Sequence, residues 1–245
     1  MGFISTVALF LPILIILVLR LGAYRTFPAL LIYYSGVFIY NLFTEGFVHV
    51  DRQVMRYWGI TNNLLDIPLL LTFLIYFSSS NTFTRRIKTL IWGFILFEAI
   101  VVVIFGLNVN AITIILGPGI IIAIAFCMLF FIRQTKITIM HRKGTGKALI
   151  AASLLFAYGC YGIIYLMYYV FKTKYKDDTF LIYFLVVTLS SVLITAGIIV
   201  ERKRIRKLYE LKLTRRELST VYSHEKKPIG AIRPVMLDYD RDQWN

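Results

Sequence analysis

Hydrophobic positions fill long continuous stretches of this chain, and short polar segments separate them. A hydrocarbon layer of about 30 Å takes about 20 apolar residues per helix, and stretches of nearly that length or more follow one another along the sequence. The first stretch lacks the basic start and cleavage site of a removable signal peptide, so we expect it to be retained as a helix. The pattern predicts seven membrane-spanning helices, at residues 3–19, 28–50, 58–77, 87–107, 110–132, 148–171 and 179–200.

Composition supports the same class of protein. Hydrophobic residues make up 58% of the chain and charged residues only 16%, which is more apolar surface than a soluble core of this size buries. We therefore expect an all-α, polytopic membrane protein, with a transmembrane domain at 1–200 and a basic, partly helical tail at 201–245.

Basic residues are distributed unequally between the two sets of connecting loops, and this inequality predicts orientation. One set contains Arg20, Arg25, Arg85, Arg86, Lys88, Arg133, Lys136, Arg142, Lys143 and Lys147, and then the tail that begins Glu201-Arg-Lys-Arg. The other set has fewer basic residues, and acidic neighbours offset part of their charge. The sequence thus predicts a multi-pass protein of a bacterial-type cytoplasmic membrane, with the N-terminus outside and the C-terminus cytoplasmic.

The net charge of +14 is explained by this orientation and by contact with anionic membrane lipids, so nucleic acid is not expected as a partner. The stretch HRKGTGK at 141–147 contains glycines and lysines but lacks the spacing of a Walker motif and a preceding strand. We assign it no nucleotide, and the sequence predicts no cofactor and no metal.

Polar side chains inside two of the predicted helices are the first candidate site. Asn62, Asn63 and Asp66 lie near the start of helix 58–77, with Asp66 about 12 Å below the outer boundary. In helix 28–50, three polar residues spaced by four form one stripe: Asn41, Glu45 and His49. Because a short loop joins these helices, we expect Asp66 and its asparagines to face Glu45 and Asn41.

Other helices contribute polar groups at similar depths. Glu98 comes near the middle of its helix, and Tyr158 and Tyr161 lie on one face of another. Gly-Pro-Gly at 117–119 is expected to break or kink its helix, because proline removes an amide donor and clashes with the preceding turn. The sequence predicts an outward-facing polar cavity whose ligand- or ion-binding residues are Asn41, Glu45, His49, Asn62, Asn63, Asp66, Glu98, Tyr158 and Tyr161.

A structural interpretation stands beside the functional one. An asparagine in a membrane helix can serve only to hydrogen-bond a neighbouring helix, and this applies to Asn41, Asn62 and Asn63. A buried carboxylate costs about 2.5–3.5 kcal/mol on the insertion scale, which favours a functional role or a neutral state for Asp66 and Glu98. Glu45 is subject to the same argument.

Seven helices with an outside N-terminus and short loops resemble the architecture of microbial rhodopsins. The stretch LLDIPLLL at 64–71 is similar to that family's third-helix pattern, in which Arg-Tyr and Asp-Trp precede Thr-x-Pro-Leu. Aligned on Pro68, Asn62 takes the place of the counter-ion carboxylate and Asp66 that of the threonine. Arg56 and Tyr57 lie three residues too far upstream. The match covers the overall topology and about a dozen residues of this helix.

One departure from the rhodopsin pattern changes what the resemblance implies. The family attaches retinal to a lysine in the middle of its seventh helix, and the corresponding stretch here, TFLIYFLVVTLSSVLITAGIIV at 179–200, contains no lysine. The resemblance therefore implies an opsin-like scaffold without covalent retinal.

Three functions remain open at this point. The first is an opsin-like sensor or binding module, which takes a small-molecule or ion ligand and binds a cytoplasmic protein through residues 201–245. The second is a proton- or ion-linked transporter that uses the intramembrane carboxylates. The third is an intramembrane lipid-modifying enzyme, for which the sequence specifies no nucleophile or catalytic residue. A homo-oligomer is compatible with the sequence, which leaves the oligomeric state open.

Overall fold

The computed structural model of the chain describes residues 2–22, 24–78, 80–141, 144–167, 171 and 176–224. All regular elements in these ranges are helical, as the sequence predicts, and no strand occurs among them. The elements are α1 (Gly2–Val18), α2 (Phe27–Thr44), α3 (Arg52–Leu74), the short 3-10 helix η1 (Ile75–Phe77), α4 (Asn81–Phe105), α5 (Val109–His141), α6 (Thr145–Tyr165) and α7 (Lys176–His224).

Six helices in the described chain, α2 to α7, are long enough and apolar enough to cross a membrane. The helix α1 is apolar but has 17 residues, a length of about 25 Å at 1.5 Å per residue. Many large apolar side chains point outward, including Trp92, Val103 and Ile121, which are 73%, 84% and 69% exposed in the isolated chain. The chain is therefore a multi-pass membrane protein, and a seventh crossing by α1 stays a prediction.

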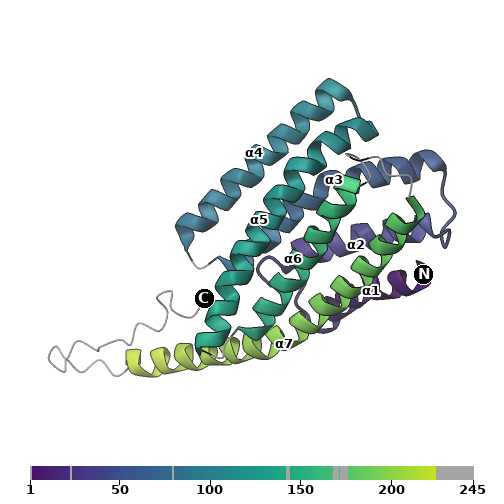
Figure 1. Ribbon diagram of the computed structural model, residues 1–245. Helices are drawn as coiled ribbons and strands as arrows, with labels where there is room; N and C mark the ends of the chain where they lie inside the picture. Colours follow the sequence, from purple (N-terminus) through teal and green to yellow (C-terminus); the bar gives the residue numbers. More distant parts are fainter. Residues whose placement is uncertain are drawn as a thin grey trace.

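Helices that follow one another in the chain run antiparallel, and the bundle forms a closed ring, because α1 packs against both α2 and α7 (Figure 1). The helix α3 also packs against α5, and α4 lies at the edge of the bundle against α3 and α5. The turns that follow α1, α3 and α5 lie at the same end of the bundle as the departing part of α7. We call this the basic end, because it carries Arg20, Arg25, Arg85, Arg86 and Arg133.

Aromatic side chains fill the core toward the basic end. Phe27, Phe73, Tyr76 and Phe77 come from α2, α3 and η1, and Phe130 of α5 packs on Phe77 with 5.6 Å between ring centroids. All five side chains are buried. This apolar layer closes the interior of the bundle between its middle and its basic end.

Of the break or kink expected at Gly-Pro-Gly, the break does not occur, because α5 continues from Val109 to His141 with Pro118 inside it, and a kink stays a prediction. The two glycines serve the packing of α5 instead. A Cβ on Gly117 would lie 2.9 Å from the Tyr165 hydroxyl, and one on Gly119 would lie 2.8 Å from a side-chain carbon of Ile67. The glycines thus let α3 and α6 approach the α5 backbone closely on either side of the proline.

The helix α7 is the longest element, with 49 residues from Lys176 to His224. It passes the domain boundary expected at residue 200 without interruption and extends beyond the bundle at the basic end (Figure 1). We call residues 205–224 the α7 extension. The extended segment expected from Pro228 onward lies outside the described residues.

Candidate functional site

The central polar contact of the bundle joins α3 to α6. The hydroxyl of Tyr158 donates a hydrogen bond of 2.5 Å to Oδ1 of Asp66. Tyr158 is 1% exposed and Asp66 is half-buried, and a hydroxyl is a neutral donor that makes a carboxyl group tolerable inside a membrane helix bundle. The sequence identified both residues as candidates, and the structure brings them together.

Further tyrosines surround this pair. Tyr33 of α2 lies against Tyr158, and both are close enough to Asp66 to interact with it electrostatically. The rings of Tyr158 and Tyr161 lie 5.8 Å apart, and Tyr161 lies 5.8 Å from Tyr183 of α7. A row of tyrosines therefore leads from Asp66 on α3 through α6 to α7.

Glu98 of α4 is a second acid near this pair. It is 7% exposed, it interacts electrostatically with Asp66, and its Oε1 atom has no hydrogen-bond partner among the described residues. We call Asp66, Tyr158, Tyr33, Tyr161 and Glu98 the core polar cluster. It contains two acids, Asp66 and Glu98, that interact with each other electrostatically.

A small internal cavity borders this cluster between α2, α6 and α7. Its volume is about 10 Å³, which is room for about one water molecule. Its polar lining consists of Tyr33, Tyr34, Ser153, Tyr158, Tyr161, Ser190 and Ser191. Of the residues predicted to bind a ligand, Tyr158 and Tyr161 line this cavity, and an outward-facing ligand cavity stays a prediction.

Asp66 lies near the middle of the 26-residue span Arg52–Phe77, because α3 begins at Arg52 and not at Trp58. The apolar pattern misplaced the start, since the first turns of α3 carry polar and charged residues that hydropathy assigns to a loop.

The register of α2 and α3 decides which side chains meet. A Cβ on Gly36 would lie 2.6 Å from Oδ1 of Asn62, and a Cβ on Gly59 would lie 3.0 Å from the Tyr40 ring. Trp58 Nε1 donates to the Gly36 carbonyl at 3.1 Å. In this antiparallel register Asp66 lies level with Tyr33, not with Glu45.

The contact expected between Asp66 and Glu45 therefore does not occur. Glu45 lies twelve residues beyond Tyr33, about 18 Å along α2 and its cap at 1.5 Å per residue. It is the exposed C-cap residue of α2, and a Cβ on Gly2 would collide with its carboxylate. His49 is exposed in the following loop. Neither side chain belongs to the core polar cluster.

The three asparagines make separate contacts. Asn41 is buried and donates a 2.7 Å hydrogen bond to the Thr6 hydroxyl of α1, so it faces α1 and not Asp66. Asn62 faces Gly36 of α2, and Asn63 donates at 2.9 Å to the Gly59 carbonyl of its own helix. The bond from Asn41 to Thr6 joins two helices, which is the purely structural role that the sequence allowed for Asn41.

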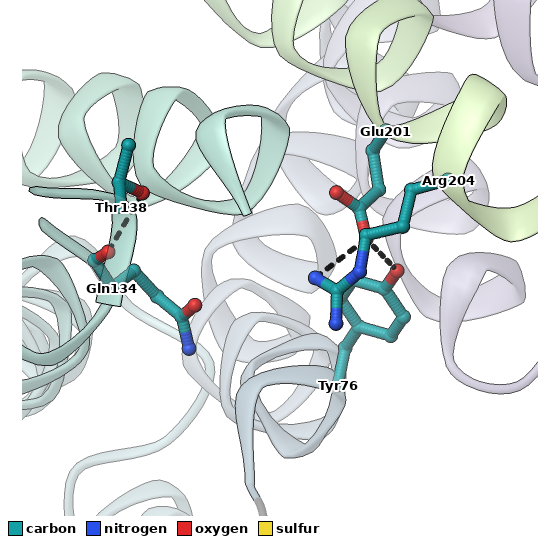
Figure 2. A network of polar contacts seen from close by, with 5 residues as sticks. All are labelled: Tyr76, Gln134, Thr138, Glu201 and Arg204. Carbon is teal, nitrogen blue, oxygen red and sulfur yellow. Dashed lines mark hydrogen bonds and ion pairs between the residues drawn. The ribbon is translucent and has the colours of Figure 1, made fainter. Parts of the chain in front are cut away.

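A second polar cluster, which the sequence did not indicate, lies at the basic end. Tyr76 donates a 2.7 Å hydrogen bond to Oε1 of Glu201, and Arg204 pairs with the same oxygen at 3.5 Å (Figure 2). Lys147 Nζ lies 4.6 Å from the centre of the Tyr76 ring. Tyr76, Lys147 and Glu201 are 4%, 4% and 2% exposed. We call Tyr76, Lys147, Glu201 and Arg204 the basic-end cluster.

Helix packing explains why these charges are buried. The helix α6 begins at Thr145, so Lys147 lies in its first turn and not in a loop. A Cβ on Gly146 would lie 2.6 Å from the backbone nitrogen of Glu201, which shows that α6 and α7 touch there through their backbones. The one available sequence signal is that Glu201 is the acid that separates an apolar span from a run of basic residues.

No protein-family model, curated protein or solved structure matches this chain. The interpretation of both clusters therefore rests on their geometry.

Proposed function

We propose that this protein is a seven-helix membrane sensor, in which a change at the Asp66–Tyr158 pair alters the position of the α7 extension. The observation that carries the proposal is the continuity of α7. One helix includes Tyr183 and Ser190 beside the core polar cluster and then projects from the basic end as far as His224. A rigid helix with one part in the polar core and another in solution suits the transmission of a movement.

Direct contacts connect the pair to α7. Tyr158 belongs to α6, and on the same helix Ser153 donates a 2.7 Å hydrogen bond to the Ser190 carbonyl of α7. The Tyr161 ring lies against Tyr183. A change of protonation or hydrogen bonding at Asp66 would therefore act first on α6, and α6 packs along the length of α7 that lies within the bundle.

In this proposal the basic end faces the cytoplasm, in keeping with the preference of basic loops for that side. The α7 extension then offers the docking surface for a cytoplasmic protein. Its exposed apolar residues Leu208, Leu211, Leu213 and Leu218 lie among charged side chains, as in helices that pair with another helix. The opsin-like layout without covalent retinal remains a prediction within this proposal.

The proposal is tested by a distance measurement across the basic end. Spin labels are placed at Ile139 of α5 and Leu211 of α7, which are 75% and 59% exposed, after the native cysteines have been replaced. In lipid nanodiscs we expect Asp66→Asn to shift the distribution of interspin distances, because it weakens the charge-assisted bond to Tyr158. Electron paramagnetic resonance measures this shift.

Asn63→Ala is the matched control, since Asn63 lies one turn away on α3 and, among the described residues, its side chain bonds its own helix alone. It should leave the distance distribution unchanged. Identical distributions in the parent protein, Asp66→Asn and Tyr158→Phe, with all three proteins folded, would rule out this route to the α7 extension.

Proton-linked transport is the second candidate, and Glu98 favours it. Its buried, unpartnered Oε1 lies on a carboxyl group that interacts with Asp66, and paired acids of this kind occur in proton relays. The aromatic layer at Phe73, Phe77 and Phe130 counts against a continuous polar path. Proton flux into liposomes that is lost in Glu98→Gln would favour the carrier over the sensor.

A further inference from the structure

Two buried side chains mark the point at which α7 leaves the bundle. Glu201 and Ile205 are 2% and 9% exposed, and Ile205 belongs to the apolar core. Beyond Ile205, every side chain of α7 that the structure describes, from Arg206 to Ser219, is exposed. Among the described residues, Glu201 and Ile205 are therefore the last that attach α7 to the bundle.

Two glycines bring α6 and α7 into backbone contact near this point. A Cβ on Gly146 would lie 2.6 Å from the backbone nitrogen of Glu201, and one on Gly197 would lie 3.2 Å from the Gly146 carbonyl oxygen. Small residues set how near two helices come, and they leave the helices able to slide and tilt. The backbone contact therefore needs a second attachment to fix the direction of α7.

A hydrogen bond provides this second attachment. Tyr76 of η1 donates at 2.7 Å to Oε1 of Glu201 (Figure 2). The Tyr76 ring is itself held, because it lies 5.3 Å from the Phe27 ring and 4.6 Å from Lys147 Nζ. The ion pair of Glu201 with Arg204 lies within α7. The bond from Tyr76 thus attaches α7 to the end of α3.

A buried carboxylate gives this attachment two stable positions. In the first, Glu201 accepts the charge-assisted bond from Tyr76, which is about twice as strong as a bond between neutral groups. Without that bond the carboxylate is stable only where water reaches it, because a buried charge that loses a partner is costly. Water is near, since Arg202 and Lys203 beside it are exposed. A tilt of α7 would therefore exchange one position for the other.

We propose that the hydrogen bond between Tyr76 and Glu201 is a latch that holds the α7 extension in one direction. When the latch opens, Glu201 moves into water, Ile205 leaves the core and the α7 extension changes direction. Because η1 directly follows α3, the helix that carries Asp66, a movement of α3 reaches the latch directly. The use of the latch in signalling rests on the proposed function, whereas its hold on α7 does not.

The test removes the Tyr76 hydroxyl from the full-length protein in lipid nanodiscs, after the native cysteines have been replaced. Tyr76→Phe keeps the ring that packs against Phe27 and Lys147. A maleimide should then modify Ile205→Cys about tenfold faster, because a hydrogen bond to a charged group contributes about 1.5 kcal/mol to the closed position. Leu211→Cys, which is 59% exposed in the parent protein, should keep its rate.

Spin labels at Ile139 and Leu211 report the direction of the α7 extension in the same variant. We expect Tyr76→Phe to broaden the distribution of interspin distances, which a loss of stability does not do while the protein stays folded. Tyr24→Phe is the matched control. The Tyr24 ring lies 6.5 Å from that of Tyr76, and among the described residues its hydroxyl has no hydrogen-bond partner.

The latch and the sensor proposal can fail separately, because Asp66 is intact in these variants. Identical distances in the parent protein and Asp66→Asn would contradict the sensor proposal and leave the latch in place. The latch is overturned by an unchanged labelling rate at Ile205→Cys or an unchanged distance distribution in folded Tyr76→Phe. Changes of the same size in Tyr24→Phe would overturn it as well.

Discussion

A tyrosine hydroxyl makes the position of Asp66 inside a membrane-spanning helix tolerable. A carboxylate at membrane depth costs about 2.5–3.5 kcal/mol on the insertion scale, and a short hydrogen bond to a neutral donor offsets part of that cost. Tyr158 provides this donor from α6, and its side chain is buried. The pair therefore stabilises the packing of α3 against α6 as well as the acid.

Removing that hydroxyl should destabilise the protein. We expect Tyr158→Phe to lower the free energy of unfolding by about 1–3 kcal/mol, because the half-buried Asp66 carboxyl group loses its donor. Equilibrium unfolding in mixed micelles measures the change. Tyr161→Phe is the control, since Tyr161 is on the same helix and the described structure gives its hydroxyl no hydrogen bond. Equal effects of the two substitutions would show that the bond to Asp66 contributes nothing specific.

Asn41 and Thr6 allow a test of a purely structural role. Their 2.7 Å hydrogen bond joins α2 to α1, away from the core polar cluster. A double-mutant cycle with Asn41→Leu and Thr6→Val should give a coupling energy of about 0.6 kcal/mol, the average for such bonds between membrane helices. The same unfolding assay measures it. We also expect Asn41→Leu to leave the spin-label distances at the basic end unchanged, and a shift would assign Asn41 to the signalling path.

At the scale of elements, glycines determine how closely helices pack. Gly146 meets the backbone of Glu201, and a Cβ on Gly197 would lie 2.6 Å from a side-chain carbon of Ile150. Small residues at such crossings let backbones approach, and packing then stabilises the pair where lipid provides no hydrophobic driving force. The close contact of α6 with α7 at these two glycines is also what buries Lys147 and Glu201.

Two glycine-to-alanine substitutions on α6 should separate the effect of the contact with α7 from the effect of alanine's higher helix propensity. We expect Gly146→Ala to lower the free energy of unfolding by about 1–3 kcal/mol, because its Cβ would lie 2.6 Å from a backbone nitrogen that cannot move independently. Gly159→Ala, on the same helix with nothing within 4 Å of its Cβ, should be neutral or stabilising. Thermal unfolding in nanodiscs compares the two variants. A stable Gly146→Ala protein would mean that α6 and α7 lie further apart.

At the scale of the whole molecule, charge is concentrated at one end of an apolar bundle. The turns after α1, α3 and α5 and the α7 extension carry most of the basic residues, and the loops at the other end carry few. Anionic headgroups and the positive-inside preference act on this asymmetry in the same direction. We therefore predict one orientation for the whole protein, with the basic end on the cytoplasmic side.

Cysteine labelling in intact cells checks that orientation. A membrane-impermeant maleimide should modify His49→Cys before lysis, because the exposed loop after α2 lies at the end opposite the basic one. Leu211→Cys on the α7 extension should be modified only after lysis. The unsubstituted protein gives the background from Cys127 and Cys160. The reverse pattern would place the α7 extension outside and exclude a cytoplasmic partner for it.

By itself, the sequence determined the helical class, the approximate places of the membrane spans and the end at which the basic residues gather. These follow from local properties, because apolar length and charge are read without knowing which helices touch. It also identified Asp66, Glu98 and Tyr158 as polar groups that must be accommodated inside the bundle.

Only the tertiary structure decided which partners these groups have. Hydropathy placed the start of α3 six residues late, at Trp58 and not at Arg52. It could not provide the register of α2 against α3, which sets Asp66 beside Tyr33 and Tyr158. In this register Glu45 lies about 18 Å further along α2. The burial of Lys147 and Glu201 depends on two backbones meeting at Gly146. Such contacts arise between residues far apart in the chain, and the period of a single helix carries no information about its neighbour's register.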